Sequence, residues 1–120
     1  MSFLNRSLRI IEQFPMGETT PQTLYEFILR AYSSFNNQII PVTKLEKNQY
    51  IMEQYYGPTA SFKDLALQLF PLFFQESIKN SKEKNVILVA TSGDTGSAVL
   101  SGFQGTSTSV VVLYPHGGVR

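Results

Sequence analysis

Hydrophobic positions in the first forty residues recur at the spacing of helices. A first helix is predicted over residues 3–14, and Pro15-Met16-Gly17 should end it. A second helix should begin with Thr20 as N-cap and Pro21 at its first helical position. Asn36-Asn37 should close this second helix. The apolar faces consist of Leu4, Leu8 and Ile11 in the first helix and of Leu24, Phe27, Ile28, Ala31, Tyr32 and Phe35 in the second.

The pattern changes to that of strands and buried elements beyond residue 40. Residues 41–45 and 49–55 flank a short polar turn at 46–48, and the second run is rich in β-forming side chains, so we predict a hairpin. From Ser61 to about Asn80 the chain is apolar on most sides, which predicts one buried helix. Pro71 should kink this helix or split it into two pieces.

Two continuous apolar runs of strand length, residues 86–90 and 110–114, enclose a helix of small residues at 97–103. This order predicts a βαβ unit with two buried parallel strands. The fold class is therefore α/β. We divide the chain into a helical N-terminal segment, residues 1–40, and an α/β domain, residues 41–120.

Composition excludes several classes of function. Ten basic and nine acidic residues leave a formal charge of +1 without a basic cluster, so we expect neither a nucleic-acid partner nor a membrane partner. The apolar runs are far shorter than the roughly 20 residues that span a bilayer. The chain has no cysteine, which fits a cytoplasmic protein, and its one histidine, His116, argues against a metal site. The oligomeric state stays open.

One short stretch carries the strongest candidate chemistry, Gly57-Pro58-Thr59-Ala60-Ser61-Phe62-Lys63-Asp64. A Gly-Pro turn leads into a helix that Thr59 or Ser61 could cap, and Lys63 falls in or near its first turn. The helix dipole and an apolar surrounding would both favour a neutral amine, the form that makes a Schiff base. A surface lysine at a helix end is the simpler interpretation of this motif alone.

A second candidate follows the strand at 86–90, where Thr91-Ser92-Gly93-Asp94-Thr95-Gly96 precedes a helix. Ligands bind at this place in parallel sheets, because helix N–H groups point at them. Small residues and hydroxyls could surround a carboxylate or phosphate, and Asp94 should face a cation or a hydroxyl, or cap the helix. Ordinary turn chemistry is an equal alternative on spacing alone.

These two motifs together, in this order and with the strand and Leu-Tyr-Pro that end at Pro115, closely resemble the threonine synthase family. The resemblance implies a pyridoxal 5'-phosphate (PLP) enzyme of fold type II, the tryptophan-synthase-β group. It implies that Lys63 holds PLP as a Schiff base and shuttles protons, and that Asp94 contacts the cofactor. The implied reaction converts the small-molecule amino acid O-phospho-L-homoserine and water into L-threonine and phosphate. The implied substrate pocket consists of Thr91, Ser92, Gly93, Asp94 and Thr95.

Two departures from the family pattern affect this expectation. Tyr56 stands where the family usually has histidine before Gly-Pro-Thr. The resemblance covers only the N-terminal part of such an enzyme, so the α/β domain should be incomplete. We therefore expect a fragment or truncated paralogue that binds PLP weakly and is inactive alone.

Three other functions stay open. A serine/threonine dehydratase-like PLP lyase shares the Ser-x-Lys core, although Asp64 and the Ser-Gly-Asp-Thr-Gly loop favour threonine synthase. A threonine-synthase-like module without catalysis could serve partner binding, with apolar surface exposed. A small nucleotide-binding βαβ protein has only the loop in its favour.

Overall fold

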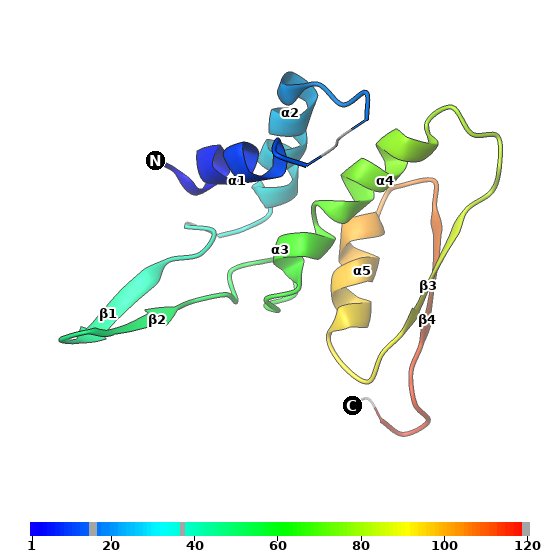
Figure 1. Cartoon of the computed structure of the whole chain (residues 1–120). Helices are drawn as coiled ribbons and strands as arrows, with labels where there is room; N and C mark the ends of the chain where they lie inside the picture. The colour runs from blue at the N-terminus through cyan, green and yellow to red at the C-terminus, as the bar shows by residue number, and fades with distance from the viewer. Residues whose placement is uncertain (15–16, 37, 119–120) are drawn as a thin grey trace.

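The computed structural model describes residues 1–14, 17–36 and 38–118, and Figure 1 shows their helices and strands. The mixed α/β architecture confirms the fold class. The elements in chain order are α1 (Phe3–Ile11), α2 (Pro21–Tyr32), β1 (Val42–Glu46), β2 (Gln49–Met52), α3 (Asp64–Leu67), α4 (Phe70–Ile78), β3 (Val86–Ala90), α5 (Thr95–Phe103) and β4 (Ser109–Leu113).

The two N-terminal helices begin as their sequences predict. In α1 the Ser2 side chain accepts from the Asn5 N–H, and in α2 the Thr20 side chain accepts from the Thr23 N–H, with Pro21 in the first turn. Both helices end earlier than predicted, α1 at Ile11 and α2 at Tyr32. The predicted stop signals at Pro15, Met16 and Asn37 lie outside the described residues.

One hydrophobic core joins these helices to the segment that carries the lysine. Its buried members are Leu24, Ile28, Ala31, Tyr32 and Leu69. Around them pack α1 side chains, such as Leu4 and Leu8, and Leu65 and Leu72 from α3 and α4. The Tyr32 hydroxyl donates to the Leu65 carbonyl over 2.9 Å. The division of the chain at residue 40 stays a prediction, and both of its parts contribute to this core.

The predicted hairpin is confirmed: β1 and β2 pair antiparallel, with Val42 opposite Met52. All residues of both strands are exposed, and in Figure 1 the hairpin extends away from the helices. Asn48 in the turn has a φ of 71°, a left-handed conformation that asparagine tolerates.

The helix predicted from Ser61 to about Asn80 is divided in the structure into two, α3 and α4, and begins three residues later, at Asp64. Pro71 lies in the first turn of α4, where a missing N–H costs nothing, so the split that Pro71 predicts is confirmed. The expectation of burial on all sides fails for α4, since Phe70 is 42% exposed and Pro71 is its one buried residue.

The C-terminal βαβ unit is confirmed, with β3 and β4 paired in parallel and Leu88 opposite Val111. Side chains alternate between a face that is partly buried and one that is exposed. A Cβ on Gly96 would lie 2.7 Å from Val112 Cγ1 of β4 and 2.0 Å from the Tyr114 hydroxyl, so glycine allows α5 to approach β4 this closely. The large apolar side chains on the exposed face are Val86, Leu88, Val111 and Leu113.

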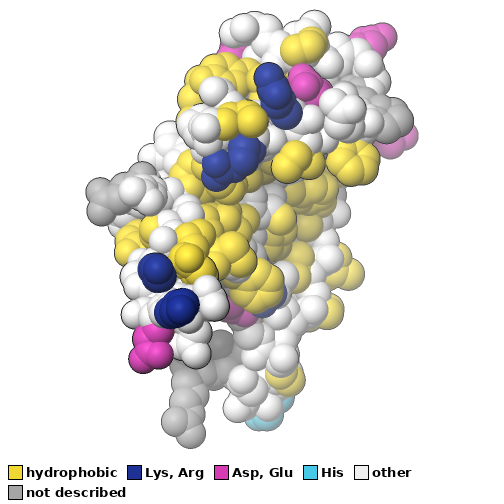
Figure 2. Space-filling model, turned by 60° about the vertical axis from the view of Figure 1, so that its left-hand side comes forward, with side chains coloured by type: hydrophobic (Ala, Val, Ile, Leu, Met, Phe, Trp, Pro, Cys, Tyr) yellow, Lys and Arg dark blue, Asp and Glu magenta, His cyan; other side chains and the backbone are white. Residues whose placement is uncertain are grey.

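The molecule is flat, with extents of 55 × 44 × 21 Å. Its radius of gyration is 16.3 Å, against about 14 Å for a compact domain of this length. Hydrophobic side chains gather in a patch on the face shown in Figure 2, with basic side chains at its edges. Exposed apolar surface is therefore extensive. Among the described residues no helix is long and apolar enough to cross a membrane.

Candidate active site

The turn before α3 is organised by the carboxylate of Asp64, which is fully buried. The Thr59 N–H donates to Asp64 Oδ2 over 2.8 Å, and the Thr59 hydroxyl donates to Oδ1 over 2.7 Å. These two bonds close residues 59–64 into a loop, in which Ala60 has a φ of 56°. The predicted capping by Thr59 or Ser61 is wrong, since Lys63 occupies the N-cap position and no side chain caps α3.

Gly57 is required in this turn for close approach rather than for an unusual backbone angle. A Cβ at this position would lie 2.5 Å from Asp64 Oδ2 and 2.6 Å from Asp64 Cβ. Its φ is not in the left-handed region. Gly57 therefore allows the turn to pack against the buried carboxylate of Asp64.

The structure brings Lys63 and Asp94 together, although 31 positions separate them in the sequence. Lys63 Nζ donates to Asp94 Oδ1 over 2.7 Å, and the Ser61 hydroxyl donates to Asp94 Oδ2 over 2.6 Å. The lysine and aspartate side chains are 29% and 52% exposed. Hydrogen bonds from Lys63 and then from Ser61 lower the pKa of Asp94 to about 2, so Asp94 is a carboxylate at neutral pH.

This geometry replaces the apolar surrounding that the sequence predicts for Lys63. The amine forms an ion pair with Asp94 and lies 4.7 Å from the centre of the Phe62 ring. Asp94 makes no side-chain cap for α5. Of the alternatives for Asp94, the structure therefore has the one in which it faces a cation and a hydroxyl.

The loop between β3 and α5 holds the other predicted site residues at the carboxyl end of β3. The Thr91 N–H donates to the Leu113 carbonyl, which ties the loop to β4. The Gly93 N–H donates to the Thr91 hydroxyl over 3.1 Å, so it is already engaged within the loop. Ser92 and Gly93 are exposed, and Thr91 and Thr95 are half-buried. The roles of these residues in binding substrate stay predictions.

Sequence reasoning missed one polar bridge that fixes the two motifs relative to each other. Gln68 Nε2 donates to Asp64 Oδ1 and to the Ala98 carbonyl, both over 3.3 Å, and so joins α3 to α5. The four-residue spacing of Asp64 and Gln68 was the available signal, because such pairs meet on a helix. The contact across to α5 had no signal in the sequence.

Tyr56, at the position where the family usually has histidine, contacts the base of the hairpin. Its hydroxyl donates to Glu53 Oε2 over 3.0 Å, and the Tyr55 hydroxyl donates to the same oxygen over 2.6 Å. Thr43 donates to Oε1 of Glu53. The bond to Glu53 raises the pKa of Tyr55 to about 12, which keeps this phenol protonated. Glu53 thus holds three hydroxyl groups at this point.

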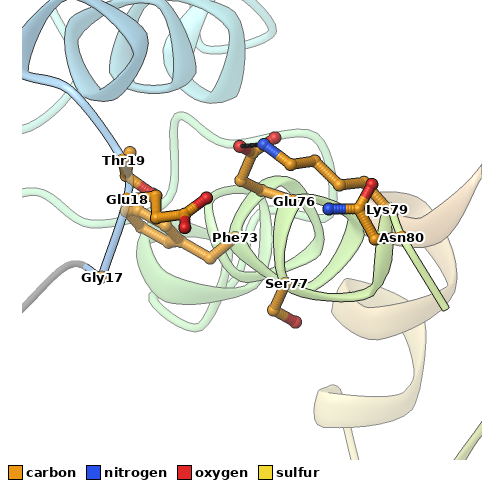
Figure 3. A pocket seen from close by; sticks show the side chains of 8 residues that line it. All are labelled: Gly17, Glu18, Thr19, Phe73, Glu76, Ser77, Lys79 and Asn80. Atoms are coloured by element: carbon orange, nitrogen blue, oxygen red, sulfur yellow. Dashed lines mark hydrogen bonds and ion pairs between the residues drawn. The ribbon is translucent and has the colours of Figure 1, made fainter.

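A separate open cavity of about 470 Å³ lies between the start of α2 and the end of α4. Figure 3 shows Glu18 and Phe73 lining it, with the ion pair between Lys79 and Glu76 at one side. The predicted site residues do not line this cavity. The candidate chemistry of the chain therefore lies at Lys63 and Asp94.

Comparison with known sequences finds relatives over nearly the whole chain. Threonine synthase from Saccharomyces cerevisiae is 37% identical over 99% of this chain and 26% of its own length. Threonine synthase-like 1 from Pongo abelii is 51% identical over 69% of this chain and 12% of its own length. No family model matches. The chain spans about a quarter or less of the curated relatives named here.

Solved structures give the same result. A PLP-bound threonine synthase from Brucella melitensis superimposes with a TM-score of 0.89 and 30% identity, over 99% of this chain and 26% of that one. Threonine synthase from Escherichia coli superimposes with a TM-score of 0.79 and 33% identity, over 98% of this chain. Both the sequence and the arrangement of elements are thus similar to about a quarter of such an enzyme.

Proposed function

Since the chain belongs to the threonine synthase family and matches about a quarter of its relatives' length, we propose that it supplies the cofactor lysine and the substrate loop of a PLP-dependent enzyme. The proposed reaction converts O-phospho-L-homoserine and water into L-threonine and phosphate. The main observation in support of this proposal is the contact between Lys63 and Asp94. It brings together the two motifs, residues 57–64 and 91–96, that resemble the threonine synthase family. The similar structure from Brucella melitensis, which is PLP-bound, supports the choice of cofactor.

The residues present fit this cofactor. Lys63 is a partly exposed amine that an aldehyde can reach, and it lies beside a loop at the carboxyl end of a parallel strand. Lys63 would hold PLP through Nζ, with Asp94 beside it. When bound, PLP supplies an electron sink for the substrate carbon, while the protein supplies position and proton transfer.

The chain's own residues would then divide the remaining tasks. Lys63 Nζ would carry protons to and from the substrate, because it lies at the loop and is bonded there to Asp94. Thr91, Ser92, Gly93 and Thr95 would orient the substrate through hydroxyl and N–H groups. The Gly93 N–H would first have to leave the Thr91 hydroxyl to serve in this way.

We expect the 120-residue chain to be catalytically inactive by itself. We also expect the protein to be located in the cytoplasm. The candidate site offers one amine, Lys63, and one loop, whereas the relatives are about four times as long as this chain. The bond from Tyr56 to Glu53 anchors the hairpin, so we expect Tyr56 to contribute to the position of the following turn rather than to proton transfer.

A chimera tests the proposed reaction. Residues 1–120 would replace the matching quarter of the yeast threonine synthase, and phosphate release from O-phospho-L-homoserine would be measured. We expect release from the chimera, none from the isolated chain, and none from the chimera with Lys63→Ala. A Lys44→Ala chimera is the matched control, since Lys44 lies on the exposed hairpin.

The same preparation separates the proposed reaction from a dehydratase. Formation of a 2-oxo acid from serine or threonine, without phosphate release from O-phospho-L-homoserine, would favour the dehydratase-like lyase. A folded chimera that binds PLP but converts neither substrate would contradict the proposed catalysis. It would favour the alternative of a threonine-synthase-like module without catalytic activity.

A further inference from the structure

Three polar contacts among Ser61, Lys63 and Asp94 form a closed ring. The Lys63 backbone N–H donates to the Ser61 hydroxyl oxygen over 3.2 Å, and that hydroxyl donates to Asp94 Oδ2 over 2.6 Å. Asp94 Oδ1 accepts from Lys63 Nζ over 2.7 Å. Both ends of the lysine are therefore held by the same serine–aspartate pair.

Ser61 links the Lys63 backbone to the Asp94 carboxylate, because its hydroxyl accepts one of these bonds and donates the other. The hydroxyl oxygen accepts from the lysine backbone, so its hydrogen is available to the carboxylate, and Ser61 is 5% exposed. Asp94 is 52% exposed, and the bonds that hold its carboxylate come from Ser61 on one oxygen and from Lys63 on the other. We propose that Ser61 is a positioning residue, which aims the Asp94 carboxylate at the Lys63 amine and so holds the amine in an ion pair until an aldehyde takes it.

The surrounding charges leave Asp94 as the partner of this amine. Asp64 is the next residue in the chain, but its carboxylate accepts from Thr59 and Gln68. Gln68 also bonds to the Ala98 carbonyl on α5. Asp64 and Gln68 thus hold α3 at a fixed distance from α5, across which Lys63 reaches Asp94. Neither of them competes with Asp94 for the Lys63 amine.

If the chain binds PLP as proposed above, the ring of contacts among Ser61, Lys63 and Asp94 affects how the cofactor is bound. Imine formation needs an amine that is free to attack the aldehyde, and the Lys63 amine is engaged by the Asp94 carboxylate over 2.7 Å. Loading should therefore require Lys63 to leave Asp94. Asp94 would keep its bond to Ser61, so the carboxylate would stay beside the newly loaded lysine.

Trace reductive methylation tests the ring in the 120-residue chain at neutral pH. Limiting isotope-labelled formaldehyde and cyanoborohydride would be added, and methylation of each lysine would be read by peptide mapping. Asp94→Asn and Ser61→Ala should each raise the rate at Lys63 about two- to fivefold, the range expected for loss of a partly exposed ion pair. The rates at the other lysines should not change.

The other ion pair among the described residues, Lys79 with Glu76, supplies a matched control. Glu76→Gln should raise methylation of Lys79 and leave Lys63 unchanged. An unchanged Lys63 rate in Asp94→Asn would overturn the ion pair. An effect of Asp94→Asn without any effect of Ser61→Ala would overturn the positioning role of Ser61. A rise at all lysines together in Ser61→Ala would indicate unfolding and would also overturn that role.

A second arm replaces formaldehyde with PLP and keeps every other condition. If the proposed function fails and the ring is correct, the formaldehyde result will hold while PLP shows no greater preference for Lys63 than formaldehyde does. If both are correct, the ratio of PLP labelling to formaldehyde labelling will be higher at Lys63 than at Lys79.

Discussion

The buried carboxylate of Asp64 should be essential to the turn that presents Lys63, and Asp64→Ala tests this. The substitution removes the acceptor of two short bonds from Thr59 and of a longer one from Gln68. Hydrogen bonds to charged groups contribute about 1.5–3 kcal/mol each. Thr59 is half-buried, so water can replace part of the loss.

We therefore use the low end for the two Thr59 bonds and expect a loss of about 3 kcal/mol in the free energy of unfolding. A protein of this size has roughly 5–15 kcal/mol in total, and 3 kcal/mol corresponds to a fall in Tm of very roughly 10 °C. Urea unfolding followed by far-UV circular dichroism measures this loss. Glu83→Gln, at an exposed acidic residue, is the control and should change stability by less than about 0.5 kcal/mol.

A double-mutant cycle with Thr59→Val isolates the hydroxyl bond from the other effects of Asp64→Ala. The two substitutions should be non-additive by about 1 kcal/mol or more, because they remove the same contact. A destabilisation below about 1 kcal/mol in Asp64→Ala, or full additivity in the cycle, would refute the reasoning that Asp64 organises this turn.

Three further predictions follow from single contacts. Tyr32→Phe should cost about 1 kcal/mol in urea unfolding, because it leaves a carbonyl of α3 without its donor; no measurable change would contradict this. Gly102→Ala should cost about 1–3 kcal/mol or more, since its Cβ would lie 2.0 Å from the Leu67 backbone oxygen; a neutral result would show that α3 and α5 do not touch there. In carboxyl NMR titration Asp94 should show a midpoint near pH 2, so its contribution to stability is present above its ordinary pKa of 3.8 and is lost as the pH falls through about 2. In Lys63→Ala that midpoint should return toward 3.8, and an unchanged midpoint would argue against the ion pair.

Local patterns in the sequence were sufficient for most of the fold. Thr20-Pro21 starts α2, the β-rich run after residue 48 forms β2, and the apolar run at 86–90 forms β3, because each signal acts within a few residues. Pro71 correctly predicted a break in the helix. The sequence did not predict that a new helix, α4, would begin there with Pro71 in its first turn. Helix ends were the least accurate, since long-range bonds decide them: the Asn36 N–H, for example, donates to the Tyr56 carbonyl.

The candidate site shows the same limit more clearly. Residue types alone identified Lys63 and the loop at Asp94 as candidates, and the resemblance joined them. The ion pair between them depends on how α3 packs against α5, which Gln68 and Gly102 determine through contacts far apart in the sequence. For this reason the sequence predicted an apolar surrounding for the amine, where the structure has a carboxylate and a buried serine.

We propose above that Lys63 is the amine that holds the cofactor, beside the loop at residues 91–95. The most direct measurement is to load the yeast chimera with PLP, reduce it with borohydride and map the modified lysine. We expect one modified lysine per chain, at Lys63, and loss of that label in Lys63→Ala. A label distributed over several lysines, or one found elsewhere with Lys63 unmodified, would contradict it.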